Sequence, residues 1–84
     1  MIKQSVVVSD RLGIHARPSA RIARIASQFH SKIEIANGEQ RADASSTLSI
    51  MMLAMESGAT VEVGAEGPDE EEALAAIVAL FERE

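Results

Sequence analysis

Thr60-Val61-Glu62-Val63-Gly64-Ala65-Glu66 is the stretch that decides the fold class, and Gly67-Pro68 follows it directly. Apolar and polar residues alternate along it, which predicts a strand with Val61, Val63 and Ala65 on its buried side. The polar residues of the stretch then face water, and Gly67-Pro68 ends the strand. The stretch therefore predicts a sheet that buries one face and exposes the other.

A helix is predicted directly after this strand. Asp69 is a suitable N-cap, and Glu72 stands at the spacing of a capping box. The acidic residues 69–72 also place negative charge where the helix dipole favours it. The apolar residues that follow recur at helical spacing and predict a buried stripe, which consists of Ala73, Leu74, Ile77, Leu80 and Phe81.

The N-terminal part predicts a strand followed by a helix. Residues 3–9 contain the β-branched run Val6-Val7-Val8, and residues 10–13 then break the strand pattern. From residue 16 to residue 29 the apolar period becomes helical. The apolar face of this helix is expected to consist of Ile22, Ile25, Ala26 and Phe29.

The middle of the chain predicts a hairpin. Residues 32–36 alternate between apolar and polar side chains, and Asn37-Gly38 is the strongest short hairpin signal that a sequence can carry. Residues 39–43 hold only Ala42 as an apolar residue in their middle. A short edge strand is therefore expected there, protected by its charged side chains.

Residues 44–56 predict the second helix, with Ser45 or Ser46 as its N-cap and Ser57-Gly58 as its end. The complete order is β-α-β-β-α-β-α, without a linker or an internal repeat. This order predicts a single domain over residues 1–84 with an α+β fold of two layers, in which three helices cover one face of a mainly antiparallel sheet. The pattern alone leaves the order of the four strands open.

The composition excludes several classes of function. The 84 residues include no cysteine, which removes disulfides and thiolate sites and fits a reducing compartment. The first four residues become polar too early for a signal peptide, and no apolar run approaches the roughly 20 residues of a membrane span. We therefore expect a cytoplasmic protein without membrane insertion.

The formal net charge of −5 is unevenly distributed, because residues 1–32 carry +5 and residues 33–84 carry −10. An acidic total argues against nucleic acid as the main partner, since such binding depends on the neutralisation of phosphates. His30 has no acidic residue, cysteine or second histidine at a metal-ligand spacing. We therefore expect no metal and no other cofactor.

Gly13-Ile14-His15-Ala16-Arg17-Pro18 stands between the first strand and the first helix. Pro18 fits the first turn of a helix, where its missing N–H costs nothing, and this makes His15 the expected N-cap. Histidine caps poorly, so another role is indicated. The helix dipole favours a neutral, nucleophilic ring. A phosphoryl group on that ring would meet the free N–H groups of Ala16 and Arg17 and the Arg17 guanidinium.

Taken alone, a His-x-Arg pair is more often an ordinary surface histidine beside a solvated arginine. In its hexapeptide context it resembles the active-site signature of HPr, the histidine-containing phosphocarrier of the bacterial phosphoenolpyruvate-dependent phosphotransferase system. The resemblance covers the whole chain, including Asn37-Gly38, the serine-led second helix and Gly67-Pro68. It implies an HPr-like open-faced β-sandwich with sheet order 1-4-2-3. Residues 67–76 are especially similar to the nitrogen-related NPr branch.

The resemblance implies a phosphocarrier rather than a stand-alone enzyme. In that family the histidine matching His15 accepts phosphate through Nδ1, as pros-phosphohistidine, from Enzyme I and passes it to EIIA-type proteins, and the arginine matching Arg17 assists. Such a carrier serves sugar transport or nitrogen-related regulation, and we expect it to be a monomer. The least favoured hypothesis is a small acid–base enzyme that pairs His15 with an acid such as Asp10, which the chain's size and its lack of pocket-lining aromatic residues disfavour.

A docking surface is expected beside His15. Arg17, Arg21 and Arg24 share the helix face opposite the apolar one and would steer acidic partner surfaces, although solvated charge is the simpler interpretation. The second helix has more apolar residues than one buried face needs, and methionine suits a surface that meets unlike partners. Ile50, Leu53 and Ala54 are expected in the core, and Leu48, Met51, Met52 and Met55 are in excess. The residues expected to contact partners are Arg21, Arg24, Thr47, Leu48 and Met51.

Ser46 is first of all a helix N-cap. The family adds a second role, because the matching serine is phosphorylated in many bacteria by HPr kinase/phosphorylase. Here Ser45 precedes it, where many members carry a basic residue, and this counts against recognition by the kinase. A regulatory binding module controlled by phosphorylation of Ser46 is nevertheless the second hypothesis.

Overall fold

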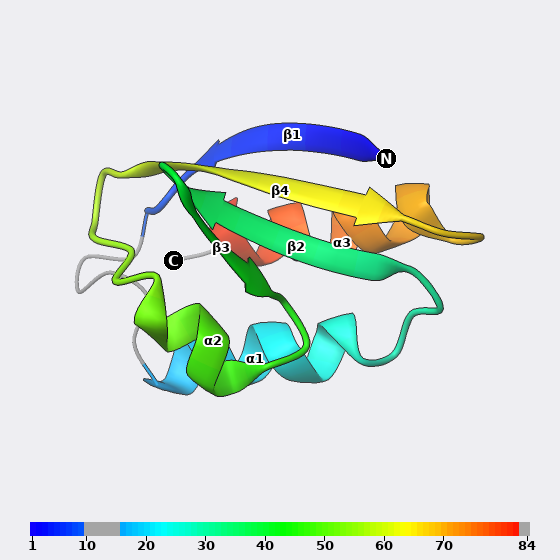
Figure 1. Cartoon of the computed structure of the whole chain (residues 1–84), viewed down its shortest axis with the longest axis horizontal. Coiled ribbons are helices and arrows are strands. Elements are labelled where there is room, and N and C mark those ends of the chain that lie inside the picture. The colour runs from blue at the N-terminus through cyan, green and yellow to red at the C-terminus, as the bar shows by residue number, and fades with distance from the viewer. Residues whose placement is uncertain (10–15, 83–84) are drawn as a thin grey trace.

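The computed structural model describes residues 1–9 and 16–82. A four-stranded antiparallel sheet with the order β1-β4-β2-β3 forms one layer, and the helices lie against one of its faces (Figure 1). The expected fold and strand order are therefore confirmed. The elements along the chain are β1 (Ile2–Val7), α1 (Ala16–Ala26), β2 (Lys32–Asn37), β3 (Gln40–Asp43), α2 (Thr47–Met52), β4 (Thr60–Glu66) and α3 (Glu70–Glu82).

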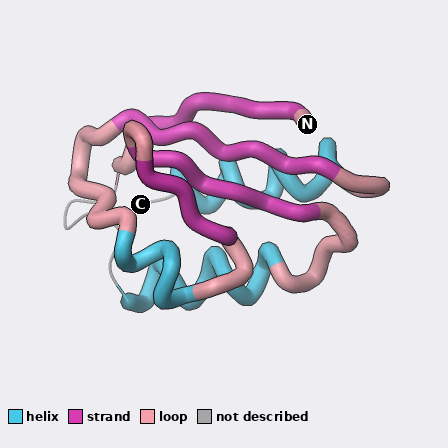
Figure 2. The backbone as a smooth tube through the Cα atoms, viewed as in Figure 1, coloured by secondary structure: helices cyan, strands magenta, loops and turns pink. Residues whose placement is uncertain are grey.

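The central strand β4 has the bounds that its alternating pattern predicts. It pairs with β1 on one side and with β2 on the other (Figure 2). In this register Val61 lies opposite Val6, and Val63 lies opposite Ile35. All four of these side chains are buried. The register therefore brings the apolar residues of three strands to the one face that the helices cover.

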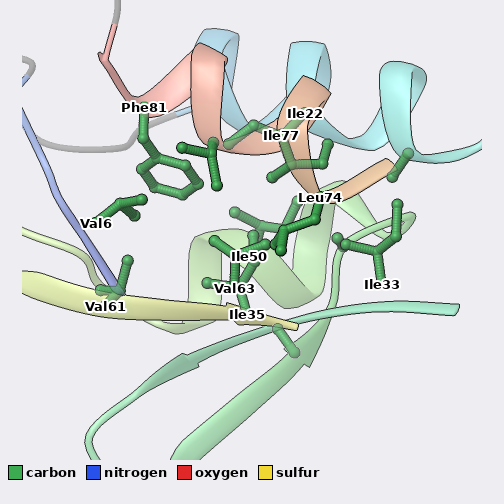
Figure 3. Packing of buried hydrophobic residues seen from close by; sticks show 14 of the residues in the cluster. Val6, Ile22, Ile33, Ile35, Ile50, Val61, Val63, Leu74, Ile77 and Phe81 are labelled. Carbon is green, nitrogen blue, oxygen red and sulfur yellow. The ribbon is translucent and has the colours of Figure 1, made fainter. Parts of the chain in front are cut away.

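The core lies between this face and the helices (Figure 3). Ile50 of α2 and Ile77 of α3 are completely inaccessible to solvent, and Phe81 is 2% exposed. α3 also buries Val78, which lies outside the predicted apolar stripe, and its Leu80 is only partly buried. Aliphatic side chains therefore fill most of the core, with Phe81 as its largest member.

The predicted ends of α1 and α2 are wrong. α1 ends at Ala26 rather than at residue 29, and α2 covers only Thr47–Met52 rather than residues 44–56. α2 stops because Leu53 caps its C-terminus and Ala54 adopts a φ of 51°. Asn37 Nδ2 donates to the Leu53 carbonyl oxygen at 2.9 Å, which holds this end in place. Ala54 is consequently exposed rather than part of the core.

We expect the Ala54→Gly variant to be more stable than the parent chain. The left-handed conformation costs a residue with a Cβ atom roughly 1–2 kcal/mol, and the greater freedom of glycine in the unfolded chain offsets part of that gain. The free energy of unfolding, measured by urea titration, should rise by about 0.5–1 kcal/mol. Ala54→Val should lower the free energy of unfolding. A loss of stability in the glycine variant would contradict the backbone strain inferred at Ala54.

The bounds of three strands also differ from prediction. β1 covers Ile2–Val7 rather than residues 3–9, β2 ends at Asn37 rather than at residue 36, and β3 begins at Gln40 rather than at residue 39. Because Asn37 pairs with Gln40, the hairpin turn consists of Gly38 and Glu39 rather than of Asn37-Gly38. Gly38 has a φ of 66°, which glycine adopts without a steric penalty.

The N-terminus of α3 is held differently from the expected capping box. The carboxylate of Asp69 accepts hydrogen bonds from the His30 backbone N–H at 2.9 Å and from the Ser31 hydroxyl, so it joins α3 to the loop before β2. Glu70, not Glu72, supplies the reciprocal carboxylate, because its Oε1 accepts from the Gly67 N–H at 3.1 Å.

These hydrogen bonds lower the pKa of Asp69 below its ordinary value, the His30 bond being the largest cause. A carboxyl group with a lowered folded pKa stabilises the fold above its unfolded pKa, and the contribution disappears as the pH falls through the folded pKa. Asp69→Asn should therefore melt below the parent at pH 7, and the difference should shrink below about pH 4. Thermal melts between pH 2 and pH 7 measure this, and a difference independent of pH would contradict it.

Candidate functional site

The expected phosphoryl acceptor, His15, and its proposed alternative partner, Asp10, lie outside the described residues. The structure does describe the residues that follow His15. Ala16 and Arg17 are the first two residues of α1, and both are exposed. Because no carbonyl of α1 lies four residues before them, their N–H groups have no partner within this helix. The positive end of the α1 dipole is therefore next to position 15 in the chain.

The arginines of α1 lie on its solvent face, as predicted. Arg17, Arg21 and Arg24 are exposed, and we call these three residues the basic strip. The opposite face of α1 is buried and consists of Ser19, Ile22, Ala23 and Ala26. Within residues 1–9 and 16–82, the side-chain ion pairs are Lys3–Glu62 at 3.8 Å and Arg41–Glu34 at 3.5 Å. Neither pair includes an arginine of the basic strip.

α2 exposes apolar side chains, as the surplus in its sequence predicts. Leu48, Met51 and Met52 are 69%, 42% and 71% exposed, and we call these three residues the apolar patch. They stand at positions i, i+3 and i+4, so they share one side of the helix. Met52 was not among the expected contact residues, although its spacing from Leu48 could have placed it there. Met55 is 2% exposed, so this surplus methionine belongs to the core.

The basic strip and the apolar patch belong to neighbouring helices. α1 and α2 pack against each other on the same side of the sheet (Figure 1). The last turn of α2 lies at the end of the molecule where α1 begins (Figure 1). The two helices that carry the expected docking residues are therefore neighbours on one side of the sheet.

Ser46, rather than Ser45, is the N-cap of α2. Its Oγ accepts a hydrogen bond from the Ser49 N–H at 3.2 Å, and its backbone is extended with a φ of −113°. Ser45 instead donates from Oγ and N to Asp43 Oδ1, at 2.7 Å and 2.9 Å. These two bonds are the main cause of the lowered pKa of Asp43. Thr47, the first residue of α2, is partly exposed.

His30 is an exposed loop residue. The described part of the chain holds no group of three or more side chains that could together ligate a metal ion. In the same residues, every helix is too short or too polar to cross a bilayer.

Comparisons with known proteins agree on one family. The family model for the PTS HPr component phosphorylation site matches residues 2–83. The phosphocarrier protein NPr of Escherichia coli (strain K12) is 41% identical over 81 residues, which cover 95% of this chain and 90% of that protein. The phosphocarrier protein HPr of Treponema pallidum (strain Nichols) is 43% identical over 82 residues, which cover 98% and 93%.

The solved structures give the same result. The crystal structure of HPr-C-His from Thermoanaerobacter tengcongensis matches with a TM-score of 0.92 at 38% identity, over 98% of this chain and 92% of that one. The family inferred from residues 13–18 is thereby confirmed, together with its fold. The chain belongs to the HPr family, the phosphocarriers of the phosphotransferase system.

Proposed function

We propose that this phosphocarrier accepts a phosphoryl group on Nδ1 of His15 from Enzyme I and passes it to an EIIA-type protein. One observation carries the proposal: His15 directly precedes α1, whose exposed face bears the basic strip. In each transfer the Nδ1–phosphorus bond forms or breaks as the bond between phosphorus and the partner's atom breaks or forms. The chain thus carries the group between cytoplasmic partners and needs no substrate pocket of its own.

The start of α1 favours both states of this histidine. The helix dipole disfavours a positive charge at the N-terminus, which keeps the unphosphorylated ring neutral and able to attack phosphorus. After transfer the same dipole favours the negative phosphoryl group, and the N–H groups of Ala16 and Arg17 can donate to it. The Arg17 guanidinium adds charge-assisted bonds, since it is exposed and carries no ion pair among the described residues.

The partners are proposed to dock on the basic strip and the apolar patch, with Arg21, Arg24, Thr47, Leu48 and Met51 as contact residues. The two features have separate roles. The arginines attract an acidic partner surface at long range and orient it. Leu48 and Met51 then lose their contact with water, and methionine can adapt to unlike partner surfaces. One surface can therefore serve both Enzyme I and an EIIA-type protein in turn.

The two histidines provide a matched test of this function. The carrier is incubated with phosphoenolpyruvate and Enzyme I, and an EIIA-type protein is then added. The parent chain and His30→Ala should take up phosphate and release it to the EIIA-type protein, whereas His15→Ala should take up none. A His15→Ala variant that still relays phosphate would contradict the proposal.

We place the carrier in the nitrogen-related branch, because residues 67–76 resemble that branch. Enzyme I proteins from both branches should then phosphorylate it with unequal efficiency, measured as kcat/KM. A higher kcat/KM with the nitrogen-branch enzyme supports this assignment. A higher value with the sugar-branch enzyme would instead assign the carrier to sugar uptake.

A regulatory module controlled by Ser46 is the second candidate, and HPr kinase/phosphorylase would be its further partner. The position of Ser46 supports it, since the serine caps α2 immediately before the apolar patch. Phosphate there would add negative charge beside the docking surface. This candidate gains preference if His15→Ala keeps full activity in cells while Ser46→Ala loses it.

A further inference from the structure

The four methionines lie in three different environments. Met51 and Met52 belong to the apolar patch and are 42% and 71% exposed, whereas Met55, in the segment after α2, is 2% exposed. Met1 is 49% exposed, but its side chain lies over Gly64 of β4, where a Cβ atom would be 3.1 Å from the Met1 sulfur. Gly64 stands between the buried Val63 and Ala65 in β4, so it belongs to the sheet face that points away from the helices. It pairs with Lys3 and Glu34. Met1, which lies over Gly64, is therefore on the opposite side of the sheet from α2.

We propose that Met51 and Met52 are oxidation sites through which a peroxide weakens the docking of partners, an inference that rests on the proposed function. Each thioether sulfur takes one oxygen atom from hydrogen peroxide. The O–O bond breaks, a sulfoxide forms, and water leaves, so the sulfur is oxidised and the peroxide is reduced. The sulfoxide remains until a methionine sulfoxide reductase removes its oxygen.

The exposure of the sulfur-bearing side chains predicts which of them react. Peroxide must reach the sulfur from solvent, so Met52, Met51 and Met1 should oxidise quickly and Met55 slowly. Oxidation at Met51 and Met52 changes exposed side chains and should leave the core intact. Met55, which packs within the core, would destabilise the fold if it were oxidised.

The consequence for docking follows from the change in polarity. The apolar patch contributes to docking by losing its contact with water. A sulfoxide is a strong hydrogen-bond acceptor, and burying it without a donor costs free energy. The basic strip carries no sulfur and keeps its charge. Oxidation should therefore raise the KM for the carrier while the chemical step on His15 keeps its rate.

The test oxidises the carrier alone and then removes the peroxide with catalase before Enzyme I is added. Peptide mass spectrometry locates the sulfoxides, and thermal melting verifies the fold. With phosphoenolpyruvate and Enzyme I, the KM for the carrier should rise about three- to tenfold at an unchanged kcat. Treatment with both methionine sulfoxide reductases should restore it, which separates this effect from damage to His15.

Matched variants assign the effect to α2. Met51→Leu with Met52→Leu keeps the apolar patch apolar but removes its sulfur. Each carrier is compared with itself before treatment, and peroxide should not raise the KM of this double variant above its own untreated value. Met1→Leu should remain as sensitive as the parent chain. The inference fails if sulfoxides at both positions leave KM unchanged, or if the double variant loses as much as the parent. An untreated carrier that accepts no phosphate would overturn the proposed function itself, before any oxidant is added.

Discussion

Replacing both Arg21 and Arg24 with glutamate should raise the KM of Enzyme I for the carrier at least about tenfold. The new carboxylates would face the proposed acidic surface of the partner, and contact between like charges costs several kcal/mol. Both side chains are exposed on α1, so the free energy of unfolding should change little. The kcat should fall much less than kcat/KM, because neither side chain belongs to the proposed phosphoryl site. Steady-state phosphorylation by Enzyme I and phosphoenolpyruvate measures both constants.

The matched control makes the same change in net charge elsewhere. Lys32→Glu with Arg41→Glu alters two exposed residues of β2 and β3. They alternate with the buried Ile33 and Ala42, so they lie on the sheet face opposite the helices. Arg41 pairs with Glu34 at 3.5 Å, but an exposed pair of this kind contributes little to stability. This control should keep a KM close to that of the parent. Equal effects in both double variants would show that total charge, not the basic strip, governs docking.

Phe81→Ala should cost about 3–5 kcal/mol of unfolding free energy, because it removes a large buried side chain and leaves a cavity. Phe81 is 2% exposed and belongs to α3, which packs against β1 and β4 (Figure 3). Small domains have a total stability of only about 5–15 kcal/mol. The variant should therefore unfold at a much lower urea concentration, as measured by circular dichroism.

Leu80→Ala is the control for this loss. Leu80 precedes Phe81 on the same helix but is only partly buried, so its truncation should cost clearly less. Ser9 Oγ donates to the Phe81 backbone carbonyl at 2.7 Å, and the Phe81→Ala variant retains this acceptor. If the two variants lose equal stability, the packing of Phe81 is not what stabilises this end of α3.

The sequence was most informative where one physical signal decided the structure. The period-2 alternation of residues 60–66 gave the bounds of β4, and its apolar positions are buried in the core. The helical spacing of the arginines correctly placed them on the exposed face of α1. The strand order could not be obtained from periodicity, because alternation does not specify which strands are neighbours. The family resemblance supplied it.

The errors arose where tertiary contacts compete with local patterns. α2 is shorter than its apolar run because Ala54 leaves the helical conformation. In addition, the side chain of Asn37, in β2, donates a hydrogen bond to the Leu53 carbonyl at the end of α2. Asp69 follows the N-cap rule in sequence, yet its carboxylate bonds residues 30 and 31. Periodicity also could not separate Met55, which is buried, from Met51 and Met52. That distinction depends on where the chain turns after α2.

The central claim is that His15 carries the phosphoryl group, and the mass of the parent chain tests it most directly. After incubation with phosphoenolpyruvate and Enzyme I, the carrier should gain about 80 Da as an acid-labile adduct. Trypsin cleavage at Arg21 and Arg24 separates His15 from His30, and the adduct should be found only on the peptide with His15. An unmodified chain, or an adduct on any other residue, would contradict the account.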